Sequence, residues 1–363
     1  MPLPRTFEES CHNDSAVRDL PDVKDMTPEE LERFVAFTGK EGYRSRQIMK
    51  WVYRFGVRSF EEMTDLSKAF RQELKGLARI SELEIRKVQT SKDGTKKVLF
   101  RLEDGLHVES VLIPGKRHRT LCVSTQAGCR MGCRFCLTGR GGFKRNLRVS
   151  EITDQITVCR FRLPEGKEID NIVMMGMGEP LDNYENVVKA VSVISSDWGL
   201  AVSNRKITVS TCGVVPMIER LSNDAQVNLA VSLNATDDKT RANLMPVGRL
   251  YPLKDLLGAC RKYQMPRRRR ITFEYILMDG INSSVGDAEK LAGLLRGLRC
   301  KINLIAFNEY PESEFRSPPA EAVEAFRSYL IKKGFTAILR ASKGSDILAA
   351  CGQLSAVERG DGG

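Results

Sequence analysis

Histidine and long apolar runs are scarce in this chain of 363 residues. It has three histidines, and no apolar run approaches the ~18 residues that a membrane helix needs. The first residues, MPLPRTFEESCHNDS, lack the apolar core of a signal peptide. These absences predict a cytoplasmic protein without a membrane partner. Its ten cysteines are then expected to be reduced and to serve metal or redox chemistry rather than disulfides.

Positive charge is in excess. The 57 Lys and Arg residues outnumber 46 Asp and Glu residues, which gives a formal net charge of +11. Such a surplus favours a polyanionic partner, nucleic acid first, because each cation that neutralises a phosphate releases a counterion. Basic residues gather at 116–119, around the cysteines at 129–136, and in the run RRRR at 267–270.

The pattern of the chain divides it into five segments. Residues 1–22 show no periodicity and form a leader, and 355–363 form a short tail. Residues 23–80 form a helical accessory domain, in which Thr27, Pro28 and Glu30 give the N-cap, first-turn proline and capping box of a helix. Asp-Gly turns at 93–94 and 104–105 predict a three-strand antiparallel β meander over 81–115.

Short β-like runs alternate with helical patterns over 116–354. This alternation predicts an α/β core with a mostly parallel sheet, either open or closed into a barrel. In a βα barrel, ligands bind in the loops after the strands. Polar and cysteine residues stand at such ends: the cysteine loop follows LCVST, GMGEP follows NIVMM, and Ser210 ends KITVS.

The stretch QAGCRMGCRFCLTG places Cys129, Cys133 and Cys136 four and then three residues apart. A buried helix face is one interpretation, but Gly128 and Gly132 disfavour a helix interior. A structural zinc site is the second, although zinc takes four ligands and no second Cys-x-x-Cys exists in the chain. The third is an iron–sulfur cluster held by three thiolates, with the fourth iron open to a ligand.

The cysteine loop resembles that of the radical S-adenosylmethionine (SAM) superfamily. With NIVMMGMGEPLDNYENVV, LMPV, KINLIAFN and GSDILAACGQL, it is similar to the RNA adenine methyltransferases of the RlmN/Cfr type, from about Thr27 to about Leu354. The helical module resembles the RlmN branch. This resemblance implies a partial (βα)6-type radical SAM barrel, a [4Fe-4S] cluster on Cys129, Cys133 and Cys136, and SAM on the open iron.

The same resemblance implies the reaction. An RlmN-type enzyme methylates C2 of an adenosine in the peptidyl transferase centre of 23S rRNA and of one beside the anticodon in tRNA, with two SAM per turnover. Cys351 then carries the S-methylcysteine intermediate, Cys122 is the resolving thiol, and Glu109 is the proton acceptor. The other five cysteines match no motif and are assigned to packing or chance.

For SAM, the implied contacts are Gly178, Glu179, Ser210, Ser232, Leu233, Asn234 and Asn308. Family members often have histidine where this chain has Asn234; an amide still hydrogen-bonds, so we expect SAM binding to survive. Arg44, Arg46, Lys50 and Arg54 are candidates for gripping RNA, or else a solvated helix face. The expected partners are 23S rRNA, tRNA as a second RNA substrate, and an electron donor such as flavodoxin or ferredoxin, acting on a monomer.

Three other functions stay open at this point. The Cfr branch methylates C8 of the same rRNA adenosine. A zinc-stabilised, non-catalytic RNA-binding protein would also be basic. A radical SAM enzyme with another substrate, such as a protein activase, would give no reason for paired thiols outside the cluster loop.

Overall fold

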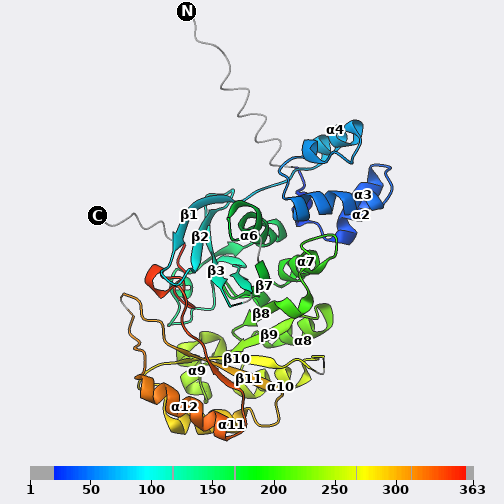
Figure 1. The fold of residues 1–363 in the computed structure, drawn as a ribbon. Helices are drawn as coiled ribbons and strands as arrows, with labels where there is room; N and C mark the ends of the chain where they lie inside the picture. Colours follow the sequence, from blue (N-terminus) through cyan, green and yellow to red (C-terminus); the bar gives the residue numbers. More distant parts are fainter. Residues whose placement is uncertain (1–19, 117, 167–168, 267, 312, 357–363) are drawn as a thin grey trace, which may run out of the picture. The chain divides into compact units, whose positions relative to one another are not determined.

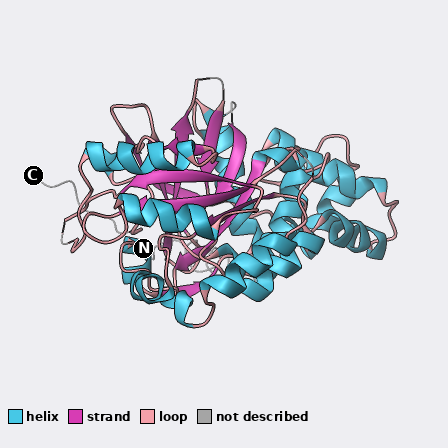
Figure 2. Cartoon of the chain, turned by 90° about the horizontal axis from the view of Figure 1, so that it is seen from below, coloured by secondary structure: helices cyan, strands magenta, loops and turns pink. Residues whose placement is uncertain are grey.

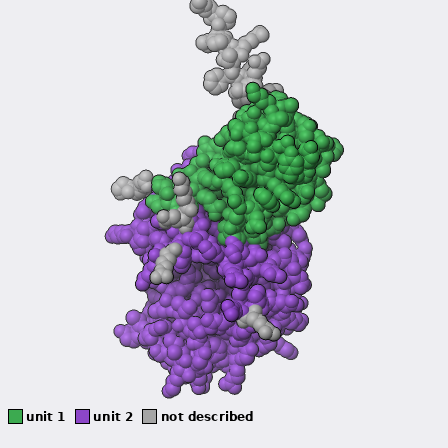
Figure 3. Space-filling model, turned by 45° about the vertical axis from the view of Figure 1, so that its right-hand side comes forward, with its two compact units in different colours: residues 1–83, 148–167, 189–202 green, residues 84–147, 168–188, 203–363 purple. Residues whose placement is uncertain are grey.

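A computed structural model describes residues 20–116, 118–166, 169–266, 268–311 and 313–356. The leader expected over 1–22 lies largely outside these residues, and so does most of the tail. The described chain forms two compact units, which Figure 3 colours separately. Residues up to 83 with 148–167 and 189–202 make unit 1, and the remainder makes unit 2.

Unit 1 is helical. It contains α2 (Pro28–Phe37), α3 (Tyr43–Lys50), which continues as the π-helical turn η2 (Trp51–Phe55), and α4 (Lys68–Leu77). Short 3-10 turns, η1 (Val23–Asp25) and η3 (Phe60–Glu62), connect them. The predicted capping box of α2 is present: the Glu30 amide donates to Thr27 Oγ1 at 3.2 Å, and the Thr27 amide donates to Glu30 Oε2 at 2.9 Å.

Unit 1 also includes helices that follow far later in the chain, α6 (Val149–Arg162) and the end of α7 (Tyr184–Ser195). A buried ion pair joins η1 to α6, with Lys24 Nζ 2.6 Å from Asp154 Oδ1. Desolvation raises the pKa of the Asp154 carboxyl, while Lys24 opposes the rise. The compact helical unit is therefore larger than a module over residues 23–80.

Unit 2 is built on one sheet, ten-stranded in the described residues. Its order is β1-β2-β3-β4-β7-β8-β9-β10-β11-β12, without closure into a barrel (Figure 1). The bounds are β1 (Glu84–Thr90), β2 (Lys96–Arg101), β3 (His107–Pro114), β4 (Arg119–Cys122), β7 (Ile169–Met174), β8 (Ile207–Thr211), β9 (Asn228–Ser232), β10 (Ile271–Leu277), β11 (Cys300–Ala306) and β12 (Ala337–Leu339).

The meander β1-β2-β3 is antiparallel, as the Asp-Gly turns predict, and β3 also pairs antiparallel with β4. From β4 to β12 every pairing is parallel. The α/β class and the open, partial barrel are confirmed, and the meander extends the same sheet. Gly94 and Gly105 have φ of 83° and 84°, which glycine adopts without the steric cost of a Cβ.

Helices connect the parallel strands, and Figure 2 shows helices lying along the strands. In unit 2 they are α8 (Val215–Asp224), α9 (Asp238–Leu244), α10 (Leu253–Lys262), α11 (Val285–Leu294) and α12 (Ala320–Lys332). Short 3-10 turns complete it: η5 (Pro180–Asp182), η6 (Asn204–Lys206), η7 (Pro246–Arg249) and η8 (Ser345–Ile347). Apolar strand residues such as Val209, Leu229 and Phe273 are fully buried between these layers.

Candidate active site

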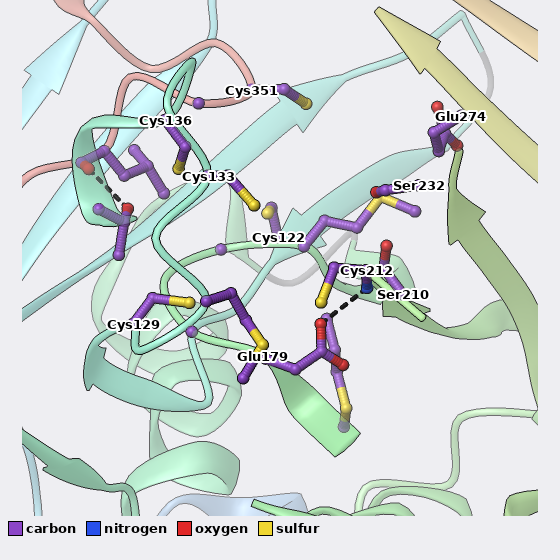
Figure 4. A pocket seen from close by; sticks show the side chains of 18 of the residues that line it. Cys122, Cys129, Cys133, Cys136, Glu179, Ser210, Cys212, Ser232, Glu274 and Cys351 are labelled. Carbon is purple, nitrogen blue, oxygen red and sulfur yellow. Dashed lines mark hydrogen bonds between the residues drawn. The ribbon is translucent and has the colours of Figure 1, made fainter. Parts of the chain in front are cut away.

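A cavity of about 180 Å³ opens within unit 2, where the strands β4 and β7 to β11 end (Figure 4). Because the carboxyl ends of parallel strands meet at one edge, residues distant in sequence converge here. Six of the lining residues are cysteines: Cys122, Cys129, Cys133, Cys136, Cys212 and Cys351. Polar lining residues are Glu179, Ser210, Thr211, Ser232 and Glu274.

The cysteine loop is shaped by a hairpin that sequence patterns did not reveal, β5 (Gln126–Gly128) with β6 (Phe143–Asn146), and by the short helix α5 (Leu137–Arg140). Gly128 has φ of 75°, and a Cβ there would lie 1.9 Å from the Gly142 oxygen. Only glycine, which has no Cβ, therefore allows the backbone at residue 128 to approach residue 142 this closely. The loop is not a regular helix, so the interpretation of the three cysteines as one buried helix face is wrong.

Cys129, Cys133 and Cys136 all line the cavity, although no three Cys, His, Asp or Glu side chains among the described residues converge in the geometry of an ion site. Burial raises the pKa of the Cys129 thiol to about 12 and that of Cys133 well above its usual range. A metal would displace these protons. Three thiols carried by one loop are the donor set that an iron–sulfur cluster takes, so these residues fit that group.

Basic residues around the loop are engaged by carboxylates. Arg130 Nε lies 2.8 Å from Asp182 Oδ2, and Arg134 Nη2 lies 2.5 Å from Glu314 Oε2. Beneath the loop, the guanidinium of Arg241 is fully buried and donates to the Cys212 carbonyl at 2.6 Å. The arginines at the loop are therefore partly structural.

Three cysteines outside the loop line the cavity: Cys212 and the two that are expected to react, Cys122 and Cys351. Cys122 ends β4, and Cys351 comes from the C-terminal segment (Figure 4). Burial raises the pKa of Cys122 to about 12, and the nearby Cys351 adds to the rise. The Cys351 side chain has accessible surface, but it sits in the concave mouth of the cavity. Desolvation there raises its thiol pKa, and Arg340 opposes the rise.

Backbone contacts tie the C-terminal segment to the cysteine loop. The Leu137 amide donates to the Gly352 carbonyl at 2.8 Å, and Thr138 Oγ1 donates to the Leu354 carbonyl at 2.7 Å. Asn308 Nδ2 donates to the Cys351 carbonyl at 3.2 Å. The backbone of residues 351–354 is thus held against the cysteine loop and Asn308, which positions Cys351.

Glu109 is 3% exposed on β3, on the strand face that also carries the cavity residues Val111 and Ile113. Its carboxylate does not line the cavity. Glu109 Oε1 lies 3.1 Å from Lys97 Nζ, and Oε2 accepts the amides of Ser355 at 2.9 Å and Ala356 at 3.1 Å. The C-terminal segment therefore caps this carboxylate.

Four of the expected SAM contacts line the cavity: Gly178, Glu179, Ser210 and Ser232. Glu179 is 4% exposed and accepts amide hydrogen bonds from Leu181 at 3.1 Å and Cys212 at 2.8 Å. Burial raises its pKa, and these hydrogen bonds oppose the rise. Its carboxylate is thus held in a fixed orientation at the cavity wall.

The other three expected SAM contacts, Leu233, Asn234 and Asn308, are not among the cavity-lining residues. Asn234 is 1% exposed with φ of 56°, and its Oδ1 accepts the Ile276 amide at 2.9 Å. Its side chain joins β9 to β10. Sequence patterns missed Glu274 and Cys212 at the cavity; a lone carboxylate in the apolar strand ITFEYIL was the available signal for the first.

Comparisons with known proteins agree with this geometry. A model of the ribosomal RNA large subunit methyltransferase N-terminal domain matches residues 21–80, and the radical SAM superfamily model matches residues 123–292. The dual-specificity RNA methyltransferase RlmN of Syntrophus aciditrophicus (strain SB) is 60% identical over 92% of this chain and 96% of its own. The enzyme of the same name from Geobacter sulfurreducens is 52% identical over 92% of this chain and 91% of its own.

Among solved structures, a radical SAM methyltransferase from Sphaerobacter thermophilus superposes with a TM-score of 0.87. It is 44% identical, and the match covers 93% of this chain and 100% of that one. No helix in the described residues is long and apolar enough to cross a membrane.

Proposed function

Because the chain belongs to the RlmN family of radical SAM RNA methyltransferases, we propose that it methylates C2 of an adenosine in the peptidyl transferase centre of 23S rRNA and of an adenosine beside the anticodon in tRNA. Cys122 and Cys351 line one cavity with the three-cysteine loop, and this observation carries the proposal. A cluster needs only the loop, whereas methyl transfer through a cysteine needs two further thiols.

Cys129, Cys133 and Cys136 hold the cluster, and Glu179 receives the ammonium group of SAM. When bound, the cluster supplies the electron that cleaves SAM into methionine and a deoxyadenosyl radical. Such a route is required because C2 of adenine is an electrophilic carbon without a useful acidic hydrogen. The cavity wall is largely apolar around the thiols, and a base that enters the mouth would displace water from Cys351.

Cys351 acts first, as the thiolate that takes a methyl group from one SAM. Loss of a hydrogen atom from this S-methyl group gives a carbon-centred radical on Cys351, which adds to C2. The adduct radical gives up one electron, which returns to the cluster, and loses its C2 proton. Cys122 then attacks the Cys351 sulfur, so that a disulfide forms, the carbon–sulfur bond to the product breaks, and the released carbon takes a proton to become the methyl group. An external one-electron donor, a flavodoxin or ferredoxin, supplies the electron for SAM cleavage, and an external dithiol supplies the two electrons that reduce the disulfide.

Glu109 takes the C2 proton. In the described structure its carboxylate is bound by the Ser355 and Ala356 amides and Lys97, so proton transfer requires the C-terminal segment to release it. A base must come within hydrogen-bond reach of the proton that it removes. The C-terminal segment both caps the Glu109 carboxylate and carries Cys351. The positions of the carboxylate and of the thiol therefore depend on the conformation of that segment.

RNA binds through phosphate contacts, with the target adenosine taken out of its stack into the cavity. In unit 1, Arg44, Arg46, Lys50 and Arg54 supply the charge. Three of them lie against aromatic rings: Arg44 over Tyr43, Arg46 over Trp198 and Lys50 over Phe55. Aromatic rings stack on unpaired bases, and the neighbouring cations attract phosphates. The protein acts in the cytoplasm as a monomer.

Anaerobic reconstitution tests the proposal. We expect a brown protein with about four irons per chain. Cys351→Ala should abolish methyl transfer to RNA and retain SAM cleavage, whereas Cys260→Ala, a buried cysteine of α10, should retain both. A colourless zinc protein, or a Cys351→Ala variant that still methylates RNA, would refute it.

A further inference from the structure

Glu274 of β10 is a buried carboxylate with one oxygen unused. Its side chain is 7% exposed and lines the cavity. Asn303 Nδ2 donates to Oε1 at 2.8 Å, and Arg340 Nη1 lies 4.0 Å from the same oxygen. The other oxygen, Oε2, is buried and has no hydrogen-bond partner in the described part of the chain. An unpaired buried carboxylate oxygen is costly, so a missing partner is implied.

The contacts of Glu274 with Asn303 and Arg340 use only one of its two carboxylate oxygens. Glu274 is in register with Ser232 of β9 and Asn303 of β11, so these three side chains form a row across the sheet. The neighbouring strand residues Phe273 and Tyr275 are fully buried. An amide side chain would satisfy Asn303 without burying a charge that Arg340, at 4.0 Å, compensates only at Oε1. The carboxylate therefore points to a ligand that enters the cavity.

Glu274 lies at the end of the cavity away from the cysteine loop. Figure 4 shows it across the cavity from Cys129, with Ser232 near it and Ser210 farther off, next to Cys212. The strand order puts β7, which leads to Glu179, three strand spacings from β10, roughly 14 Å along the sheet. A SAM molecule held by its amino-acid end at Glu179 extends its nucleoside toward Ser232 and Glu274.

On the basis of the proposed function, we propose that Glu274 Oε2 accepts a hydrogen bond from a ribose hydroxyl of SAM. An ionised carboxylate only accepts hydrogen bonds, and the ribose offers two hydroxyl donors at this end of the molecule. Asn303 fixes the orientation of the carboxylate, because it occupies Oε1 and leaves Oε2 as the free acceptor of a residue that lines the cavity. Glu274 is thus a cofactor-binding residue at the nucleoside end.

Glu274→Gln tests this role with little change in shape. The Asn303 amide still needs an acceptor, so the glutamine oxygen faces Asn303 and its amide group places a donor where Oε2 accepts. We expect SAM to bind the anaerobically reconstituted variant about tenfold to a hundredfold more weakly in equilibrium dialysis. The control Glu324→Gln on α12, an exposed carboxylate paired with Arg327, should bind SAM like the unmodified protein.

SAM analogues that lack the 2′- or the 3′-hydroxyl identify the donor. The unmodified protein should lose about tenfold or more in affinity for one analogue, and Glu274→Gln should scarcely distinguish that analogue from SAM. Equal discrimination by both proteins, or unchanged SAM affinity in Glu274→Gln, would overturn the role of Glu274. Weakened RNA binding with unchanged SAM binding would overturn it too and assign the carboxylate to the substrate adenosine.

Iron content and thermal unfolding show whether Glu274→Gln folds and carries its cluster. A variant that fails either check is replaced by Asn303→Leu, which leaves Glu274 in place but frees its orientation. We expect an intermediate loss of SAM affinity there, and no loss would also overturn the proposal. An unmodified protein that binds neither iron nor SAM would refute the proposed function itself. Failure of the proposed function is thereby distinguished from failure of the role proposed for Glu274.

Discussion

The buried pair Lys24–Asp154 lets one stability prediction be worked out in detail. Both side chains are almost fully buried, with exposed fractions of 2% and 1%. Lys24 Nζ also donates to the Ser81 carbonyl at 2.5 Å, and Asp154 Oδ2 accepts the Leu83 amide at 2.6 Å. Lys24→Met leaves the Asp154 charge buried and uncompensated, a loss that typically costs about 3–5 kcal/mol.

The double variant Lys24→Met/Asp154→Asn should recover more than half of that loss. Asparagine is neutral and keeps an acceptor for the Leu83 amide, so no buried charge remains; the Ser81 carbonyl and the new amide nitrogen lack partners, at a cost of about 1–3 kcal/mol. The control Lys75→Met removes an exposed ion pair with Glu61 in the same unit and should cost at most about 1 kcal/mol.

Tryptophan fluorescence during urea unfolding measures these changes, because the two tryptophans of the chain, Trp51 and Trp198, both belong to unit 1. The loss in free energy of unfolding caused by Lys24→Met should also become smaller at acidic pH. Burial already raises the pKa of Asp154 and Lys24 opposes the rise, so removing Lys24 raises that pKa further. A carboxyl group whose pKa is raised in the folded state lowers the free energy of unfolding at pH values above that pKa. This destabilisation fades as the pH falls through the folded pKa toward the pKa of the unfolded state. A Lys24→Met variant as stable as Lys75→Met, with no recovery in the double variant, would refute the reasoning.

Two further predictions concern the site and the RNA. Gly178→Ala should weaken SAM binding more than about tenfold, because φ is 98° and the new Cβ would lie 2.5 Å from the Gln126 Cβ. The control Gly258→Ala on α10, where no atom lies within 4 Å of the new Cβ, should leave the protein's stability unchanged or raise it slightly. Unchanged SAM affinity in Gly178→Ala would contradict the close approach. RNA affinity should fall at least about tenfold between about 50 and about 200 mM salt in filter binding, because phosphate contacts release counterions, whereas a flat response would contradict charge-driven binding.

Local signals in the sequence predicted much of the fold. The Thr27 capping box, the two Asp-Gly turns and the strand–helix alternation act over a few residues, and each forms as predicted. The family motifs then identified the cysteine loop and the two distant thiols. Local patterns could not show that α6 belongs to the helical unit, because that depends on contacts such as Lys24 with Asp154, 130 residues apart.

Register and tertiary contacts explain what the sequence could not predict at the site. Glu274 matters because β9 and β11 place Ser232 and Asn303 beside it, and no motif encodes that row. Asn234 is an expected SAM contact, yet its side chain accepts a hydrogen bond from the Ile276 amide of β10. Glu109 is held by amides of the C-terminal segment about 246 residues away, a contact that strand periodicity cannot reveal.

The central claim is methylation at C2 of adenosine, and mass spectrometry of nucleosides tests it most directly. Unmodified 23S rRNA and tRNA are incubated anaerobically with the reconstituted protein, SAM and a reductant, and are then digested to nucleosides. The account predicts 2-methyladenosine in RNA treated with the unmodified protein and none with Cys351→Ala. Formation of 8-methyladenosine, or no methylated adenosine from a protein that carries its cluster and cleaves SAM, would contradict it.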